Sequence, residues 1–505
     1  SVATDLDGEA LLRQIATDFL GLETRYRLVS GSATRRVYLD STASTLMMGA
    51  AHRGLAAFME HYANTHSLQH NSARLATGAY AWAHQRILRF VQADPDKYTC
   101  FFTGSGTTAG MNRLARVYRD LLPDRDTAVV SIMEHHSNDL PHRKHLKRVL
   151  HIPVAEEPDG PGCVDTQALE RVLKAERGRV NYVSVTGVSN VTGIMNPVAE
   201  IARLAHKYEA FVLVDGAQMV AHMPVQVSGH DDPLEDIDAL VFSGHKTYVP
   251  GSPGVVVARK DHLSRLEPME VGGGMVERVF AQRYTTTATF PDREEAGTPN
   301  IPGAVALALA IEVLDRIGME TLAAEEVQLI DYALDRLGTL AEVEIYGSTD
   351  TVACPRAASI SFNVEGLHHS LVAAILNDYH NIAVRNECFC AHPYVIEMMS
   401  EGAAEYVAMS DEEYAASKTP KPGMVRASFG LYSTPADVDA LVAALADIIQ
   451  KKDEYLPHYS VGGSDHEYRH DTFSVDQEAR LFLPQLVDDA LRRPSPEGVP
   501  RDEPA

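Results

Sequence analysis

Phe211-Val212-Leu213-Val214-Asp215-Gly216-Ala217-Gln218 is an unbroken apolar run that ends in a carboxylate and a glycine. The later stretch Ala239-Leu240-Val241-Phe242-Ser243-Gly244-His245-Lys246 has the same design, because its apolar run ends in small or polar residues and a lysine. Short apolar runs without alternation are typical of strands that are buried on both faces, as in parallel sheets covered by helices. We therefore expect two central strands whose carboxyl ends carry Asp215 and Lys246.

Further short runs of β-branched or apolar residues lie on both sides of these two. Amphipathic patterns of helical period separate them, for instance Gly110–Leu122 and Pro197–Tyr208. The alternation predicts a largely parallel sheet flanked by helices between residues 36 and 310. Ligands of such sheets bind at the carboxyl ends of the strands. The further strand candidates are Thr99–Thr103, Ala128–Ile132, Val180–Val185 and Gly254–Val257.

Beyond residue 311 the pattern changes, because long helical stretches surround two strand candidates, Ala358–Asn363 and Val425–Phe429. This change predicts a second, smaller α+β domain. The abundance of Pro, Asp, Glu and Arg in residues 485–505 predicts a frayed tail. The expected parts are an N-terminal helical segment on the small domain (1–35), a large domain (36–310), a small α+β domain (311–455) and a C-terminal extension (456–505).

Composition sets limits on the class of protein. The chain has 505 residues, 45% of them hydrophobic and 23% charged, which is typical of globular material with two or three domains. The net charge of -24 argues against nucleic-acid binding. We expect a cytoplasmic protein with no membrane segment, because no apolar run approaches the roughly 18 residues of a span and no secretory signal is evident. Five scattered cysteines predict reduced thiols rather than a disulfide framework.

Asp215 and Lys246 carry the strongest chemical signal. A lysine after a strand, flanked by Ser243, His245 and Thr247, can form a Schiff base with an aldehyde. An aspartate at the end of a neighbouring strand can keep a pyridine nitrogen protonated, which makes the ring an electron sink. Together they predict pyridoxal 5'-phosphate (PLP) as the cofactor.

Three weaker signals fit the same site. Gly104–Gly110 follows a strand and opens a helix, so it can cradle a phosphate. A variant dinucleotide-binding turn or a plain glycine-rich turn would have the same sequence pattern. His135 could stack on a cofactor ring or be a polar strand end, and no further ligands suggest a metal. Asn190 could donate to the phenolic oxygen of the cofactor or to a substrate carboxylate, or be a turn residue.

With these motifs in place, the chain resembles the class V, fold-type I PLP enzymes, and within them the cysteine desulfurase and selenocysteine lyase family. The similarity runs from Tyr38 to about Ile449 and includes the motifs Val214–Gln218, Phe242–Lys246 and Glu295–Asn300. It implies a mostly parallel seven-stranded central sheet, a smaller α+β C-terminal domain, and a homodimer with shared active sites.

The resemblance also assigns roles. Lys246 would carry the Schiff base, Asp215 would hold the pyridine nitrogen, His135 would stack on the ring and take part in catalysis, and Gln218 would touch the phenolic oxygen. The phosphate ligands would be Thr107, Thr108, Ser243 and His245, with Thr298 reaching the phosphate of the neighbouring subunit.

A desulfurase also needs a thiol nucleophile and a basic group for the substrate carboxylate. By the resemblance, Cys390 takes the nucleophile position, Arg426 binds the carboxylate, and Arg385 is a second basic residue. Cys388 keeps the nucleophile assignment open, because residues two apart point the same way if the segment is extended. Cys390 itself could also be a small buried hydrophobe.

The predicted reaction is the conversion of L-cysteine to L-alanine, with a persulfide formed on Cys390 and a possible protein acceptor for the sulfur. One alternative is another class V PLP enzyme, namely a C–S lyase, an aminotransferase or an epimerase acting on a larger amino acid. The other is an idle binding protein that keeps only the fold. A nicotinamide site would rest on the glycine-rich turn alone and would leave Lys246 unexplained.

Overall fold

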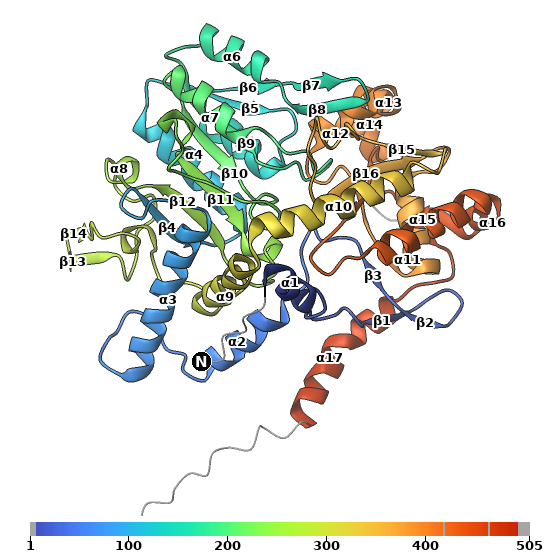
Figure 1. The fold of residues 1–505 in the computed structure, drawn as a ribbon, viewed down its shortest axis with the longest axis horizontal. Helices are drawn as coiled ribbons and strands as arrows, with labels where there is room; N and C mark the ends of the chain where they lie inside the picture. The colour runs from blue at the N-terminus through green and yellow to red at the C-terminus, as the bar shows by residue number, and fades with distance from the viewer. Residues whose placement is uncertain (1–6, 418–419, 463–464, 493–505) are drawn as a thin grey trace, which may run out of the picture.

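The computed structural model describes residues 7–417, 420–462 and 465–492. It has two lobes, with the large central sheet on one side and a smaller sheet with its helices on the other (Figure 1). Each lobe has its own sheet, so the change of pattern near residue 311 reflects a change of architecture.

The central sheet has seven strands in the order β4-β12-β11-β10-β9-β5-β6. β10 pairs in parallel with β9 and β11, and β5 pairs in parallel with β9 and β6. Only β12 runs antiparallel to its neighbours, β11 and β4. This confirms the predicted mostly parallel seven-stranded sheet. The strands are β4 (Tyr98–Thr103), β5 (Thr127–Ser131), β6 (Arg148–Ile152), β9 (Val180–Thr186), β10 (Phe211–Asp215), β11 (Ala239–Ser243) and β12 (Gly254–Arg259).

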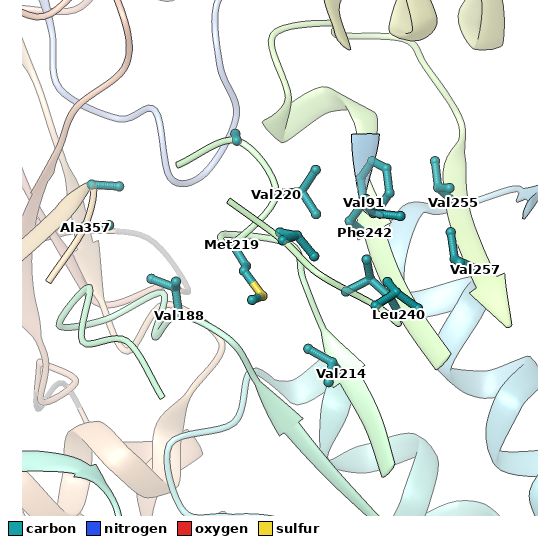
Figure 2. Packing of buried hydrophobic residues seen from close by; sticks show 14 of the residues in the cluster. Val91, Val188, Val214, Met219, Val220, Leu240, Phe242, Val255, Val257 and Ala357 are labelled. Carbon is teal, nitrogen blue, oxygen red and sulfur yellow. The ribbon is translucent and has the colours of Figure 1, made fainter. Parts of the chain in front are cut away.

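Both faces of the sheet are covered, which explains the unbroken apolar runs. Val214 and Leu240 belong to a core cluster shared with α9 (Ile301–Ile317), whereas Leu213 and Val241 belong to a cluster shared with α4 (Gly106–Leu121). Side chains of β10, β11 and β12 meet in the first of these clusters (Figure 2). Successive residues of one strand therefore serve opposite layers, and every position must be apolar.

The small lobe is built on a four-stranded antiparallel sheet in the order β15-β16-β19-β18. Its own apolar core joins this sheet to α10, α11 and α15. A short parallel pairing of β17 with β3 (Val37–Tyr38) brings the N-terminal part of the chain to this lobe. α1 (Gly8–Ala16) contacts both α9 and α10. The small-lobe elements are β15 (Val343–Ile345), β16 (Ser359–Val364), β17 (Ile382–Ala383), β18 (Arg385–Glu387), β19 (Met424–Ser428), α10 (Met319–Leu337), α11 (His369–His380) and α15 (Pro435–Gln450).

The C-terminal end differs from the predicted frayed tail. Residues 485–492 belong to α17 (Asp476–Arg492), and the rest of the predicted tail lies outside the described residues. Phe482, Leu483, Leu486 and Val487 share one face of this helix at helical spacing, a local pattern that the bulk composition hides. α17 projects from the body of the molecule (Figure 1).

No helix in the described ranges is both long and apolar enough to cross a membrane.

Candidate functional site

A cavity of about 470 Å³ opens at the carboxyl ends of β9, β10 and β11 and at the N-terminus of α4. It brings together nine of the predicted site residues. These are Thr107, Thr108, His135, Asn190, Asp215, Gln218, Ser243, His245 and Lys246.

Asp215 is the last residue of β10 and is only 3% exposed. One of its carboxylate oxygens accepts a hydrogen bond from the backbone N–H of Ala217 at 3.0 Å. Burial raises the pKa of the carboxyl, and the Ala217 N–H and Lys246 oppose this rise. Among the described residues no cation lies within ion-pair distance of Asp215. A buried carboxylate of this kind is stabilised by a cation placed in the cavity.

Lys246 ends the short 3-10 turn that follows β11, and its side chain lines the same cavity. Burial lowers the pKa of its ammonium, while Asp215 opposes that change. Its Nζ forms no hydrogen bond or ion pair with the described part of the chain. The lowered pKa and the lack of a partner favour a neutral amine that can attack an aldehyde.

His135 follows β5 and faces the cavity from another side. Its Nδ1 accepts a hydrogen bond from the backbone N–H of Ser137 at 3.0 Å. Burial, and after it the charge of Lys246, lowers the pKa of the imidazole to about 3. The ring is therefore neutral at physiological pH, which suits stacking on a cofactor ring and acceptance of a proton.

Backbone amides and hydroxyls converge at the start of α4. The Thr107 N–H donates to Ser243 Oγ at 2.8 Å, and the hydroxyls of Thr108 and Ser137 lie 2.6 Å apart. Gly106 has a φ of 56°, and a Cβ there would lie 2.5 Å from Ser243 Oγ. Ser105, the N-cap residue of α4, makes no side-chain cap hydrogen bond, and the Ser243 hydroxyl is the described side chain that accepts from the first turn, so the helix dipole still favours an anion here.

These groups fit PLP. The cavity offers a buried carboxylate for the ring nitrogen, an amine for the aldehyde, a neutral imidazole for the ring face and a cradle for the phosphate. His245 lines the cavity near the cradle, and its Nδ1 lies 3.2 Å from Ser44 Oγ. When bound, PLP supplies the electron sink for bond breaking at the substrate.

Asn190 and Gln218 line the cavity but use their amide donors on backbone carbonyls. Asn190 Nδ2 donates to the Phe389 carbonyl at 2.8 Å, and Gln218 Nε2 donates to the Thr42 carbonyl at 2.9 Å. In this arrangement Asn190 holds the segment that leads to Cys390.

Arg426 connects the small lobe to the cavity. It lies on β19, is 2% exposed, and donates from Nη1 to the Asn190 carbonyl at 2.8 Å. Burial lowers the pKa of its guanidinium to about 10, so it remains a cation at neutral pH. Arg385 pairs directly opposite Arg426 across β18 and β19 and is exposed. Asp40 Oδ1 lies 3.7 Å from Arg426 Nη2, so the two arginines share this place beside the cavity with one carboxylate and carry a net positive charge that suits a second.

The two cysteines of the segment after β18 have different surroundings. Cys390 is exposed, whereas Cys388 is buried and its thiol donates to the Pro422 carbonyl at 3.4 Å. Burial raises the pKa of Cys388 to about 12. Phe389 and Cys390 have φ of 52° and 55°, so the segment is not extended and the two thiols need not point the same way.

Thr298 lies outside this cavity. Its side chain is exposed, and its Oγ1 accepts a hydrogen bond from Asn64 Nδ2 at 3.0 Å.

Several residues of the site carry weak sequence signals and were not predicted. Ser137 and Thr186 line the cavity, and Thr186 ends β9 as Asp215 ends β10. Glu134, which precedes His135, is buried, and its carboxyl accepts hydrogen bonds from Thr186 N and Asn138 Nδ2. The polar residue at the end of each buried strand is the signal that could have found Thr186.

Comparison with known proteins gives consistent matches over most of the chain. Residues 37–441 match the family model described as aminotransferase class-V. A probable cysteine desulfurase of Halalkalibacterium halodurans is 35% identical over 429 residues, which cover 84% of this chain and 94% of the relative. A cysteine desulfurase of Cronobacter sakazakii is 34% identical over 443 residues, covering 86% and 98% of the two chains.

Solved structures agree with the sequence matches. The apo structure of a cysteine desulfurase from Thermococcus onnurineus NA1 has a TM-score of 0.70 at 29% identity, covering 82% of this chain and 95% of that chain. A cysteine desulfurase from Escherichia coli has a TM-score of 0.69 at 28% identity, covering 87% and 98% of the two chains.

Proposed function

Because this chain belongs to the aminotransferase class-V family and is a PLP-dependent enzyme, we propose that it is a cysteine desulfurase whose nucleophile is Cys390. It converts L-cysteine to L-alanine and keeps the sulfur as a persulfide. The observation that carries this proposal is an exposed thiol held beside the cavity, next to a second thiol that is buried. The relatives named above support the choice of reaction.

Each lobe contributes a part of the proposed mechanism. Arg426, with Arg385 beside it, binds the substrate carboxylate and orients the substrate sulfur toward Cys390. The Cys390 thiolate attacks that sulfur, so an S–S bond forms, the C–S bond breaks, and its electron pair stays with the carbon that becomes the alanine methyl group. His135, neutral and facing the cavity, can carry protons to and from the substrate.

Replacing Cys390 with alanine should abolish persulfide formation, whereas replacing Cys388 with alanine should leave most of the turnover. The exposed Cys390 can reach a substrate, and the buried Cys388 thiol, with its pKa raised to about 12, is a poor nucleophile at neutral pH. Alanine release from cysteine and mass spectrometry of the persulfide-bearing peptide measure both effects. Loss of activity in the Cys388→Ala variant alone would show that Cys388, and not Cys390, is the nucleophile. Full turnover of another amino acid in both variants would favour a lyase, aminotransferase or epimerase.

We also propose a homodimer in which Thr298 completes the phosphate site of the partner subunit. Thr298 is exposed and outside its own cavity, and the nearby hairpin of β13 (Val276–Phe280) and β14 (Arg283–Thr286) exposes large apolar side chains. A partner subunit would cover the exposed side chains of this hairpin, which are Val279, Phe280 and Tyr284.

Hybrid dimers should test this arrangement. A hybrid of a Lys246→Ala chain with a Thr298→Val chain contains one intact site if Thr298 acts across the interface. We expect such hybrids, separated by two affinity tags, to bind PLP at that site as tightly as the parent. The Thr298→Val homodimer should bind PLP several-fold more weakly. If Thr298 acts within its own chain, no site in the hybrid would be intact, and PLP affinity would stay low.

A further inference from the structure

Two histidines outside the proposed machinery meet beside Cys390. His136 follows β5, and His392 is the first residue of α12 (His392–Met399). Their rings are stacked with centroids 4.9 Å apart and planes at 21°, and His392 Nδ1 lies 3.1 Å from His136 Nε2. The backbone N–H of His136 donates to the Cys390 carbonyl at 2.7 Å. The pair is therefore attached directly to the residue that bears the exposed thiol.

The hydrogen bonds assign one proton arrangement to the pair. His136 Nε2 also faces the backbone N–H of His392 at 3.4 Å, so it is the acceptor and His392 Nδ1 is the donor. The free ring nitrogen of His392, Nε2, lies 3.9 Å from Glu387 Oε1. Two protons cannot occupy the short contact between the rings. The pair can therefore accept one extra proton, and the nitrogen that faces Glu387 is the best place for it.

Charged groups from several elements face this pair. Asp139 and Arg143 act on His136 with opposite signs, and Glu387 and Lys421 do so on His392. Burial lowers the pKa of both imidazoles, and for His136 the presence of His392 adds to the lowering. Burial therefore makes each ring a weaker base than free imidazole, and Asp139 and Glu387 are the groups that favour the protonated form of the pair. The thiol itself also lies in the field of Lys246 and Arg426.

We propose that His136 and His392 act as one imidazole pair that accepts the proton of the Cys390 thiol. This rests on the proposed role of Cys390. In this step the S–H bond breaks, its electron pair stays on sulfur, and the proton passes to the pair, where an N–H bond forms at His392 Nε2 beside Glu387. Cys390 is exposed, so a water molecule can carry the proton over the remaining distance. The result is a thiolate next to a cationic histidine pair, an arrangement that favours nucleophilic attack.

The test is the pH dependence of Cys390 alkylation, which needs no turnover. The PLP-loaded enzyme is treated with iodoacetamide across a range of pH, and the Cys390 peptide is followed by mass spectrometry. In His136→Gln and in His392→Gln we expect the alkylation midpoint to move to higher pH and the rate at pH 7 to fall by about tenfold, the effect of one pKa unit. The double variant should match the single variants within about twofold, because the two rings act as a unit.

Two further variants make the result decisive. His230→Gln is the matched control, since His230 pairs with Asp236 in the large lobe and should leave the midpoint unchanged. Glu387→Gln removes the carboxylate beside His392 and should raise the midpoint by a smaller amount. If circular dichroism shows that a histidine variant does not fold, the alkylation midpoint of Glu387→Gln becomes the test of the proposal. Unchanged midpoints in the folded histidine variants, or in Glu387→Gln where those do not fold, would overturn the proposal. Full turnover in Cys390→Ala would instead overturn the role of Cys390 as nucleophile, while the titration would still report on the pair.

Discussion

Replacing Lys246 with alanine should abolish turnover and leave a folded protein that can still bind PLP without a covalent bond. Of the described residues that line the cavity, Lys246 is the one lysine, and its amine has no other partner there. Its loss removes both the covalent anchor of the cofactor and an amine able to move protons at the reacting carbon. We expect the rate of alanine release to fall by at least about 10³-fold, or about 4 kcal/mol in the activation free energy.

Borohydride reduction gives an independent readout of the same assignment. In the parent enzyme, reduction should attach PLP to the peptide that contains Lys246, and in the alanine variant it should attach PLP to none. Lys260→Ala serves as the control, because Lys260 donates to the Pro95 carbonyl at the surface and is remote from the cavity. Covalent labelling of another lysine in the parent enzyme would show that the assignment is wrong.

Replacing Asp215 with asparagine should have the second large effect, because it removes the charge but keeps the shape. The amide oxygen can still accept the Ala217 N–H, so the end of β10 should keep its conformation. A carboxylate about 4 Å from a pyridinium contributes about 4 kcal/mol at an effective dielectric constant near 20, or roughly three pKa units on the ring nitrogen. Without it the ring nitrogen should lose its proton near neutral pH, and turnover should fall by about 10³-fold.

Thermal stability separates this electrostatic effect from damage to the fold. Burial raises the pKa of Asp215 in the folded state. A raised folded-state pKa means that the group favours folding at low pH and that this contribution is lost as the pH rises through the folded-state pKa. The cofactor-free Asp215→Asn variant escapes that loss, so its Tm at pH 7 should equal or exceed that of the cofactor-free parent. Asp231→Asn, at an exposed position, is the matched control. Turnover within tenfold of the parent would exclude the proposed role of Asp215.

The central sheet and the cavity were predictable because their signals are local. Val214 and Leu213 pack into opposite layers of the core, so the strand must be apolar throughout. The polar residue that ends it therefore lies beyond the core, at the carboxyl ends of the strands. The direction of β12 was not predictable, since a strand buried on both faces has the same pattern whether it runs parallel or antiparallel. The helical end of the chain was not predictable from composition, because residues 485–505 are rich in Pro and charged residues and only their first part belongs to α17.

Other parts of the site depend on contacts that no local pattern encodes. Arg426 meets Asn190 across 236 positions of sequence. The left-handed backbone at Phe389 and Cys390, which gives the two cysteines different surroundings, is held by the large lobe through Asn190. The identity of these residues was available from the sequence, whereas their geometry is set by the packing of one lobe on the other.

The large lobe donates two hydrogen bonds to the Cys390 segment, from Asn190 and His136, and both end on backbone carbonyls, those of Phe389 and Cys390. Neither bond depends on which side chain stands at position 390. Evolution could therefore exchange the thiol at this position for another group without dismantling the scaffold that presents it. The reaction would change while the geometry stayed the same, so the site separates the task of placing a reactive group from the choice of that group.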